Sequence, residues 1–315
     1  MSAHAMKLLP ISPDPRPLGK SGLHVYPIAW GMWRFAGADR KTARTRIDAA
    51  LEAGITLFDT ADIYGFGKSS PFGAAEALLG ELLQEAPALR DRFVLATKGG
   101  IDPGVPYDSS AAYLRAACEA SLTRMKVDHI DLYQIHRPDL LTHPAAVAEA
   151  LAALRAEGKI GHVGVSNYLP SQLAALQAHL DFPIVTQQPE FSAWTTAPLF
   201  DGTLDQCMER GIAVLAWSPL AGGRLGLAPA EAGTAPDSAR LGNLIAKLDA
   251  LAEREGVSRE AVALAFVLAH PARIVPIIGT QTPARIARAG EALRVKLSRA
   301  DWYDILQTSM GVRLP

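Results

Sequence analysis

The stretch FVLATKGGIDPGVPYDSSAAYLRAACEASLTRMKVDHIDLYQI, residues 93–135, decides the fold. Two short apolar runs, 93–97 and 131–135, have the length of buried strands, and the segment 110–124 between them has a helical pattern. A strand, a helix and a second strand in this order predict two parallel strands joined by a right-handed crossover.

The same alternation continues along the chain in both directions. Further strands are expected near Ile28 and at 55–58, 160–165, 183–186, 212–216 and 274–278. Further helices are expected at 40–53, 73–85, 143–157, 170–179, 200–210, 240–254 and 283–290. Glycine follows several of these helical segments where a helix commonly ends, as at Gly54, Gly158 and Gly211. Eight strand–helix units favour a closed (β/α)₈ TIM barrel of the α/β class over an open doubly wound sheet.

The chain ends and one long loop complete this organisation. Residues 1–17 contain four prolines and predict an irregular tail, so the barrel is expected at 18–315. The segment LGKSGLHV (18–25) predicts a short strand pair that turns at 20–22 and caps the bottom of the barrel. A long loop at 218–239 is either a flap over a ligand or a tolerated insertion.

Composition excludes several classes of protein. Of the 315 residues, 49% are hydrophobic and 20% charged, and the net charge of −1 gives no general attraction to nucleic acid or anionic lipid. No run reaches the roughly 18 consecutive apolar residues of a membrane helix, and the proline-rich start is unlike a signal peptide. Cys118 and Cys207 have no spacing typical of a disulfide framework or a metal site. We therefore expect a cytoplasmic protein without a metal.

Four polar residues are expected to meet at one end of the barrel. Asp59, Lys98 and His136 each follow a predicted strand, and Tyr64 lies in the loop after the second strand. Each alone is more often a cap, a rim charge or a packed ring. Because the carboxyl ends of barrel strands share one mouth, their joint position indicates a catalytic site.

These residue types together predict a proton donor aimed at a carbonyl. A tyrosine with a pKa of about 10 is a poor proton shuttle near neutral pH, and an adjacent ammonium lowers that pKa by about 1 to 3 units. We expect Lys98 to act in this way on Tyr64, with Asp59 holding the lysine charged. His136 is expected to hydrogen-bond a substrate oxygen from the other side.

At this point the sequence resembles the aldo-keto reductase superfamily over about residues 18–310. The resemblance is carried by FDTADIYG (58–65), LATK (95–98), DLYQIHRPD (131–139), LGKSGLHV (18–25) and GVSNY (164–168). Within the family, TQQPE (186–190) is similar to a segment of the bacterial oxidoreductases. The resemblance implies a nicotinamide cofactor, NADPH/NADP+, bound across the barrel mouth without a Rossmann domain, and no GxGxxG motif follows the first strand.

The resemblance also implies cofactor positions. Ser166, Asn167 and Gln188 match residues that hold the nicotinamide carboxamide, and Trp217 matches the aromatic platform under its ring. The loop over the pyrophosphate matches Ser218, Leu220, Gly222 and Arg224. The segment PIIGTQTPARIARA (276–289) matches the grip on the adenosine 2′-phosphate, where a helix beginning near Pro283 favours an anion.

That last segment departs from the family pattern at two positions. Gly279 stands where many members have a lysine, and Ala289 where many have an asparagine. Donors remain at Thr280, Gln281, Arg285 and Arg288, which favours NADP(H). Discrimination against NADH is expected to rest mainly on Arg285, helped by Thr280 and Arg288.

The leading interpretation is an enzyme that reduces an aldehyde or ketone to the alcohol, with Tyr64 as general acid. A cofactor-binding, redox-sensing regulatory subunit with slow turnover is the alternative, and a sugar-phosphate isomerase or aldolase on a similar barrel is a third. An apolar rim for a small-molecule substrate is expected from Trp33, Phe35, Phe66, the stretch 101–108 and Trp194. The chain is expected to act as a monomer or small homo-oligomer.

Overall fold

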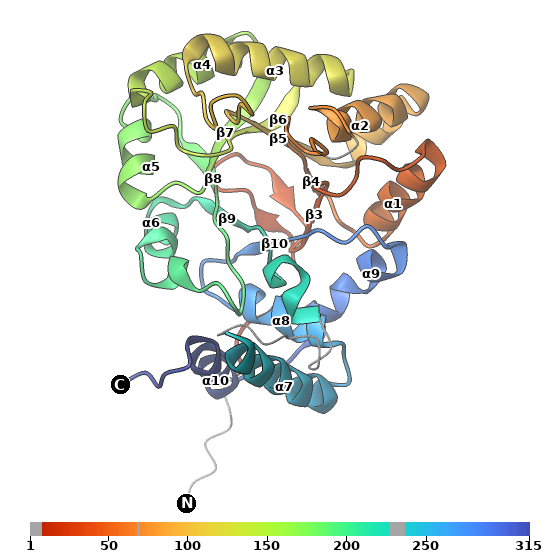
Figure 1. The fold of residues 1–315 in the computed structure, drawn as a ribbon, viewed down its shortest axis with the longest axis vertical. Helices are drawn as coiled ribbons and strands as arrows, with labels where there is room; N and C mark the ends of the chain where they lie inside the picture. Colours follow the sequence, from red (N-terminus) through yellow and green to blue (C-terminus); the bar gives the residue numbers. More distant parts are fainter. Residues whose placement is uncertain (1–7, 68–69, 227–236) are drawn as a thin grey trace, which may run out of the picture.

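Eight parallel strands close into a barrel in the computed structural model, which describes residues 8–67, 70–226 and 237–315 (Figure 1). The strands follow the order β10-β3-β4-β5-β6-β7-β8-β9 around the barrel. They are β3 (Ala29–Gly31), β4 (Leu57–Asp59), β5 (Val94–Gly99), β6 (Ile130–Ile135), β7 (Ile160–Ser166), β8 (Ile184–Gln188), β9 (Ala213–Ala216) and β10 (Val275–Ile278). Each one lies at an expected position, so the predicted barrel is confirmed.

Eight helices also lie where the sequence predicts them. They are α1 (Arg40–Glu52), α2 (Ala74–Glu85), α3 (Ala111–Met125), α4 (Pro144–Ala156), α5 (Pro170–Gln177), α6 (Thr203–Arg210), α7 (Ser238–Glu255) and α9 (Pro283–Arg288). The start of α3 shows a local cause, because the side chain of Ser110 accepts a hydrogen bond from the backbone N–H of Tyr113. Gly211 ends α6 with a φ of 67°, a left-handed conformation that glycine adopts without strain.

Two further helices escaped the sequence analysis. In α8 (Arg259–Leu268) every residue from 261 to 268 is buried, so the segment has no polar face to reveal a helical period. The second is α10 (Arg299–Met310). We expected α7 to be the helix of the seventh unit, but α8 packs against β10, and α7 and α10 form an outer pair beyond it (Figure 1). None of the described helices is long and apolar enough to cross a membrane.

The N-terminal hairpin closes one end of the barrel, as predicted. Strands β1 (Arg16–Pro17) and β2 (His24–Val25) pair antiparallel. The fully buried side chains of Leu18 and Val25 pack with barrel residues such as Leu57 and Leu132 in one apolar cluster. Pairing thus begins two residues before 18, where we expected the barrel domain to start, and that division of the chain stays a prediction.

A buried ion pair and a hydrogen bond join α2, α3 and β5 near the carboxyl end of β5. Glu76 in α2 is 0% exposed, and one of its carboxylate oxygens lies 2.7 Å from a guanidinium nitrogen of Arg124 in α3. Its other oxygen accepts a hydrogen bond of 2.5 Å from the hydroxyl of Thr97 in β5. A buried carboxylate of this kind requires both partners, so the three elements are held in one arrangement.

Close packing of α2 on α3 gives a prediction for Gly80. A Cβ at Gly80 would lie 2.1 Å from the backbone oxygen of Arg124, which cannot move aside like a side chain. We expect Gly80→Ala to lower the free energy of unfolding by about 1 to 3 kcal/mol, measured by urea denaturation. The matched control is Gly242→Ala in α7, where a Cβ meets nothing within 4 Å. This control should gain about 1 kcal/mol of stability from helix propensity, and equal effects of the two substitutions would contradict the packing argument.

Candidate active site

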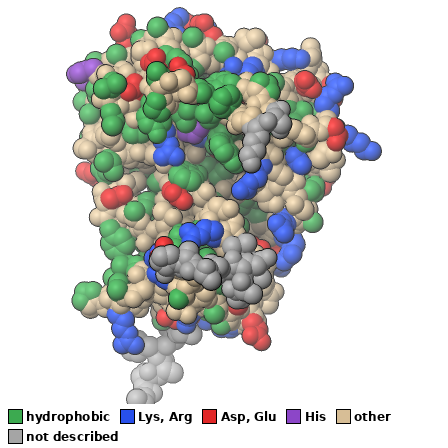
Figure 2. Space-filling model, in the orientation of Figure 1, with side chains coloured by type: hydrophobic (Ala, Val, Ile, Leu, Met, Phe, Trp, Pro, Cys, Tyr) green, Lys and Arg blue, Asp and Glu red, His purple; other side chains and the backbone are tan. Residues whose placement is uncertain are grey.

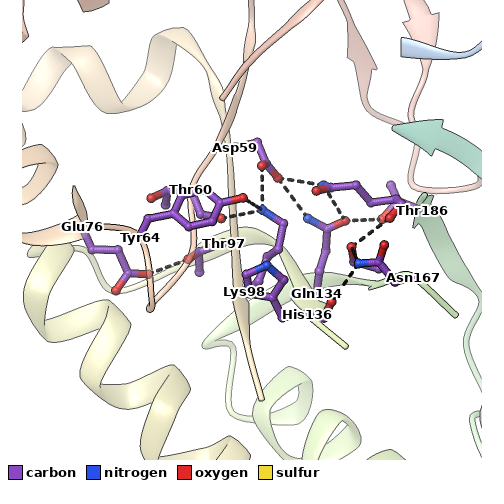
Figure 3. A network of polar contacts seen from close by, with 12 residues as sticks. Asp59, Thr60, Tyr64, Glu76, Thr97, Lys98, Gln134, His136, Asn167 and Thr186 are labelled. Atoms are coloured by element: carbon purple, nitrogen blue, oxygen red, sulfur yellow. Dashed lines mark hydrogen bonds and ion pairs between the residues drawn. The ribbon is translucent and has the colours of Figure 1, made fainter. Parts of the chain in front are cut away.

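Three of the predicted residues lie at or next to the ends of three successive strands. Asp59 is the last residue of β4, Lys98 lies near the end of β5, and His136 directly follows β6. The backbone N–H of His136 donates to the carbonyl of Gly99 at 2.9 Å, which continues the pairing of β6 with β5. Figure 3 shows these side chains and Tyr64 pointing toward one another. The convergence predicted from the strand ends is therefore present.

Lys98 lies at the centre of this group with its side chain 0% exposed. Its Nζ donates to Asp59 Oδ2 at 2.6 Å, to the carbonyl oxygen of Thr60 at 2.9 Å and to Tyr64 Oη at 3.0 Å. An ammonium group has three hydrogens, so every donor of this buried cation has a partner. The Asp59 carboxylate supplies the countercharge that makes its burial tolerable.

The loop after β4 is fastened so that Tyr64 reaches the lysine. The N–H of Thr60 donates to the carbonyl of Ala96 at 2.8 Å, and the N–H of Asp62 donates to the carbonyl of Lys98 at 3.1 Å. The loop thus follows the edge of β5 before it turns at Tyr64. Backbone hydrogen bonds therefore set the distance between the phenol and the ammonium.

Two amide side chains hold the second oxygen of Asp59. Gln188 Nε2 donates to Asp59 Oδ1 at 2.9 Å, and Gln134 Nε2 donates to the same oxygen at 3.3 Å. The hydroxyl of Thr186 donates in turn to Gln134 Oε1 at 3.2 Å. Gln134 and Thr186 were not singled out from the sequence. For Gln134 the sequence did offer a signal, a polar residue near the apolar end of DLYQI (131–135). We assigned that segment only as a strand and gave its glutamine no role.

His136 lies beside Tyr64 as a buried ring whose uncharged form is favoured. Its ring centroid is 5.9 Å from that of Tyr64, and its Nδ1 has no hydrogen-bond partner among the described residues. Its pKa is well below the usual value, because burial disfavours the charged ring and the positive charges of Lys98 and Arg137 add to that effect. A neutral imidazole can donate one hydrogen bond without carrying charge, which fits the predicted role.

The sign expected for the pKa of Tyr64 is wrong. Burial of the hydroxyl raises its pKa above the ordinary value for tyrosine, and Lys98 only opposes this rise. Asp59 acts in the same direction as burial, and its ion pair with Lys98 leaves little net charge to favour a phenolate. Tyr64 therefore remains a protonated donor throughout the neutral range.

A second carboxyl group in the same loop is shifted toward its neutral form. Asp62 is buried, and neither of its carboxyl oxygens has a hydrogen-bond partner among the described residues. Its pKa lies well above the usual range because of burial first and the neighbouring charge of Glu76 second. Both effects favour the uncharged form of Asp62, which weakens its competition with Asp59 for Lys98.

The predicted substrate rim is only partly assembled. Trp33 is 55% exposed and meets Tyr64 edge to face, with ring centroids 5.0 Å apart, while Phe66 is also exposed. Phe35 does not lie on the rim, because its side chain is fully buried and packs edge to face with Trp30. Trp194 instead carries the guanidinium of Arg224 on its ring, 4.5 Å from the centroid. The face drawn in Figure 2 is hollowed near its centre, with apolar side chains around the upper part of the hollow.

Comparison with known proteins agrees with this geometry. A sequence model of the Aldo/keto reductase family matches residues 27–309. The chain belongs to the aldo/keto reductase family. It is an oxidoreductase for carbonyl substrates, and members of this family generally use NAD(P)H.

The relatives of this aldo/keto reductase match it over nearly its whole length. A 6-dehydroglucose reductase from Novosphingobium aromaticivorans is 51% identical, over 98% of this chain and 100% of the relative. A second 6-dehydroglucose reductase, from Agrobacterium fabrum, is 38% identical over 92% of this chain and 96% of its own. Oxidoreductase YdhF from Escherichia coli is 35% identical over 90% and 94%.

The residues matched to the nicotinamide carboxamide form one hydrogen-bonded set in this aldo/keto reductase. Asn167 Nδ2 donates to Ser166 Oγ at 2.8 Å and to the carbonyl of His136 at 3.3 Å. Trp217 Nε1 donates to Asn167 Oδ1 at 2.9 Å, which fixes the plane of the indole. Gln188 Oε1 accepts no hydrogen bond from a described residue, so it can receive an amide N–H. The set therefore fits a carboxamide. The carboxamide carbonyl would accept a hydrogen bond from Asn167 Nδ2 in place of the 3.3 Å bond to the carbonyl of His136.

The pyrophosphate positions lie in a tight turn after β9. Ser218 and Gly222 have positive φ values, 49° and 68°, and a 3₁₀ helix covers Ala221–Gly226. Leu220 lies in this turn, and the guanidinium of Arg224 rests on Trp194 rather than reaching away from the protein. Residues 227–236 of the predicted flap lie outside the described residues.

The segment matched to the 2′-phosphate is joined to the end of strand β3. Trp30 Nε1 donates to the carbonyl of Thr280 at 3.0 Å, and Gln281 Nε2 donates to the carbonyl of Gly31 at 3.1 Å. The helix α9 begins at Pro283 as expected but has only six residues, so the dipole that we expected to assist is small.

The two arginines of α9 differ in their pairing. Arg288 forms an ion pair of 3.2 Å with Glu291. Arg285 is exposed, with no side-chain partner among the described residues. Of these two cations, only Arg285 is available to an anion without breaking an existing contact.

The raised pKa of Tyr64 gives a prediction that needs no substrate. In a difference titration of wild type against Tyr64→Phe, followed at the phenolate absorbance band, the Tyr64 signal should appear only above pH 10, the ordinary pKa of tyrosine. The reference is a blocked tyrosine titrated in the same buffers. A Tyr64 step below that of the reference would show that Lys98, and not burial, decides the protonation state.

Proposed function

We propose that the protein is an NADP(H)-dependent reductase of aldehydes or ketones, with Tyr64 as the general acid. The observation that carries this proposal is the contact of Tyr64 Oη with the ammonium of Lys98 at 3.0 Å, while Asp59 holds that ammonium. A reduced nicotinamide, when bound, would supply a hydride to the carbonyl carbon. The four residues then have to manage the charge and the proton at the carbonyl oxygen.

The proposed roles follow from the hydrogen-bonding capacity of each group. The substrate oxygen accepts hydrogen bonds from the Tyr64 hydroxyl and from the neutral ring of His136, which orient it. As negative charge develops on this oxygen, Tyr64 gives it a proton, and the ammonium of Lys98 stabilises the phenolate that remains. Asp59 keeps Lys98 charged and in position. The same steps in reverse oxidise an alcohol.

An uncharged sugar that carries an aldehyde is the substrate class we propose. Two relatives that span nearly the whole chain are named 6-dehydroglucose reductase, and one of them is 51% identical. The exposed Trp33 beside Tyr64 supports this choice, because an aromatic face can pack against the apolar face of a sugar ring while the hydroxyls remain solvated. The complete catalytic set favours an enzyme over the regulatory-subunit alternative.

For the cofactor we propose NADPH, and for the location the cytoplasm. Thr280 and Arg285 provide a neutral and a charged donor for a phosphate, as phosphate recognition requires, whereas the side-chain amide of Gln281 already donates to the carbonyls of Gly31 and Gly279. Both cysteines are buried free thiols, in keeping with a reducing compartment. A monomer or small homo-oligomer satisfies this chemistry, because all proposed site residues come from one chain.

Turnover with purified protein tests the proposed function. With NADPH, 6-dehydroglucose should be reduced with a higher kcat/KM than an alkyl aldehyde, and sugar phosphates should not be isomerised or cleaved. Tyr64→Phe should reduce kcat by about 10² to 10⁴-fold, because it removes one proton donor and little volume. NADPH affinity, measured by calorimetry, should change little in this variant. A loss of less than about tenfold would remove Tyr64 from the role of general acid.

The cofactor preference has its own test at Arg285. A charge-assisted hydrogen bond to phosphate contributes about 1.5 to 3 kcal/mol, or one to two powers of ten in affinity. We expect Arg285→Ala to raise the Kd of NADPH by that factor and to leave the Kd of NADH almost unchanged. Arg288→Ala is the control, because Arg288 already has a partner in Glu291. If Arg285→Ala weakened the binding of NADPH and NADH equally, Arg285 would contact a part of the cofactor other than the 2′-phosphate.

A further inference from the structure

The space beside Gly279 is occupied by a cation from a different part of the chain. Gly279 has no side chain, and a Cβ built on it would meet one neighbouring atom within 4 Å, Arg34 Nη1 at 3.9 Å. Arg34 lies in the loop between β3 and α1, some 245 residues earlier in the sequence. The guanidinium therefore stands where a long side chain at position 279 would begin.

The loop that carries Arg34 is anchored on both sides. Just before it, Trp30 and Gly31 bond to Thr280 and Gln281 of the loop after β10. Just after it, the buried ring of Phe35 packs edge to face with Trp30, with centroids 5.6 Å apart. Although the side chain of Arg34 is exposed, its backbone is thus set by contacts with the segment 279–281.

Two arginine side chains around this segment lack a counterion among the described residues. Arg34 and Arg285 are both exposed, and the side chain of neither has a hydrogen bond or ion pair with a described residue, whereas Arg288 is paired with Glu291. Lys and Arg side chains gather on the side of the molecule where α1 and α9 lie (Figures 1 and 2). Two unpaired guanidinium groups, one on the β3–α1 loop and one on α9, provide forked donors for one phosphate dianion.

We propose that Arg34 binds the adenosine 2′-phosphate of NADPH together with Arg285, and so supplies the cation that position 279 lacks. The proposal rests on the proposed function, because it assumes a nicotinamide cofactor in the barrel mouth. It revises the expectation that Arg285 carries the preference with help from Thr280 and Arg288. In this arrangement a cation has moved from the β10–α9 loop to the β3–α1 loop, and the glycine leaves room for it.

Exchanging the two positions gives a sharp test. The variants are Arg34→Ala, Arg34→Lys, Gly279→Lys and the double variant Arg34→Ala/Gly279→Lys, with Arg288→Ala as the matched control. The Kd values of NADPH, NADH, 2′,5′-ADP and 5′-AMP are measured by calorimetry on the full chain, so that no readout depends on turnover. Because Arg34 is exposed, the variants should fold, and the melting temperature of each checks this.

The expected pattern involves only ligands with a 2′-phosphate. Arg34→Ala should raise the Kd of NADPH and of 2′,5′-ADP by about 10 to 100-fold and change NADH and 5′-AMP by less than twofold. Arg34→Lys should retain most of the affinity. Gly279→Lys should restore NADPH binding in the Arg34→Ala background, but should improve it far less in the wild type, where the two cations compete for one phosphate.

Several results would overturn the proposal. Equal weakening of NADPH and NADH by Arg34→Ala would place Arg34 at the pyrophosphate, and no effect on either would leave it outside the site. Equal gains from Gly279→Lys with and without Arg34 would show that the two positions do not share a ligand. Failure of the wild-type protein to bind any of the four ligands would instead sink the proposed function, which separates the two kinds of failure.

Discussion

The buried ammonium of Lys98 is the constraint on which the site depends. Removing an isolated ion from water costs several kcal/mol even after the protein relaxes, so this side chain is tolerated only with all three of its hydrogens bonded. Each partner comes from a place that the barrel determines: Asp59 from the end of β4, and Thr60 and Tyr64 from the loop that follows it. The closed sheet thus sets the positions of these partners, and the buried charge of Lys98 requires a hydrogen-bond acceptor at each of them.

The requirement extends beyond the lysine. Asp59 is held in turn by Gln134 and Gln188, and through Gln188 the chain of hydrogen bonds continues to Ser166, Asn167 and Trp217. The proposed proton donor and the proposed nicotinamide platform therefore belong to one connected polar network across the barrel mouth. Such a network is favourable only when its members are satisfied together, which is why polar residues on strands as distant as β4 and β9 depend on one another.

The sequence predicted what depends on local pattern. Strand positions followed from short apolar runs, and the meeting of Asp59, Lys98 and His136 followed from the parallel direction of neighbouring strands. The sequence could not predict properties, such as pKa values and burial, that depend on contributions from many parts of the folded structure. The pKa of Tyr64 reflects burial together with the opposing effects of Lys98 and Asp59, and Phe35 is buried in a core that includes an edge-to-face contact with Trp30. The helix α8 was missed because complete burial erases the periodicity by which helices are found. Arg34 went unnoticed because only the fold brings it to Gly279.

The hairpin at the opposite end of the barrel limits the path by which Tyr64, if it acts as the proposed proton donor, can be reprotonated. Leu18 and Val25 close that end, and Leu57, Ala96 and Leu132 fill the interior above them with hydrocarbon. Such a floor offers no groups through which a proton could be relayed from the solvent below. In the proposed mechanism a proton given away by Tyr64 would be replaced from the mouth, the same opening through which a product would leave. The apolar plug thus assigns both events to one opening without touching any reacting atom.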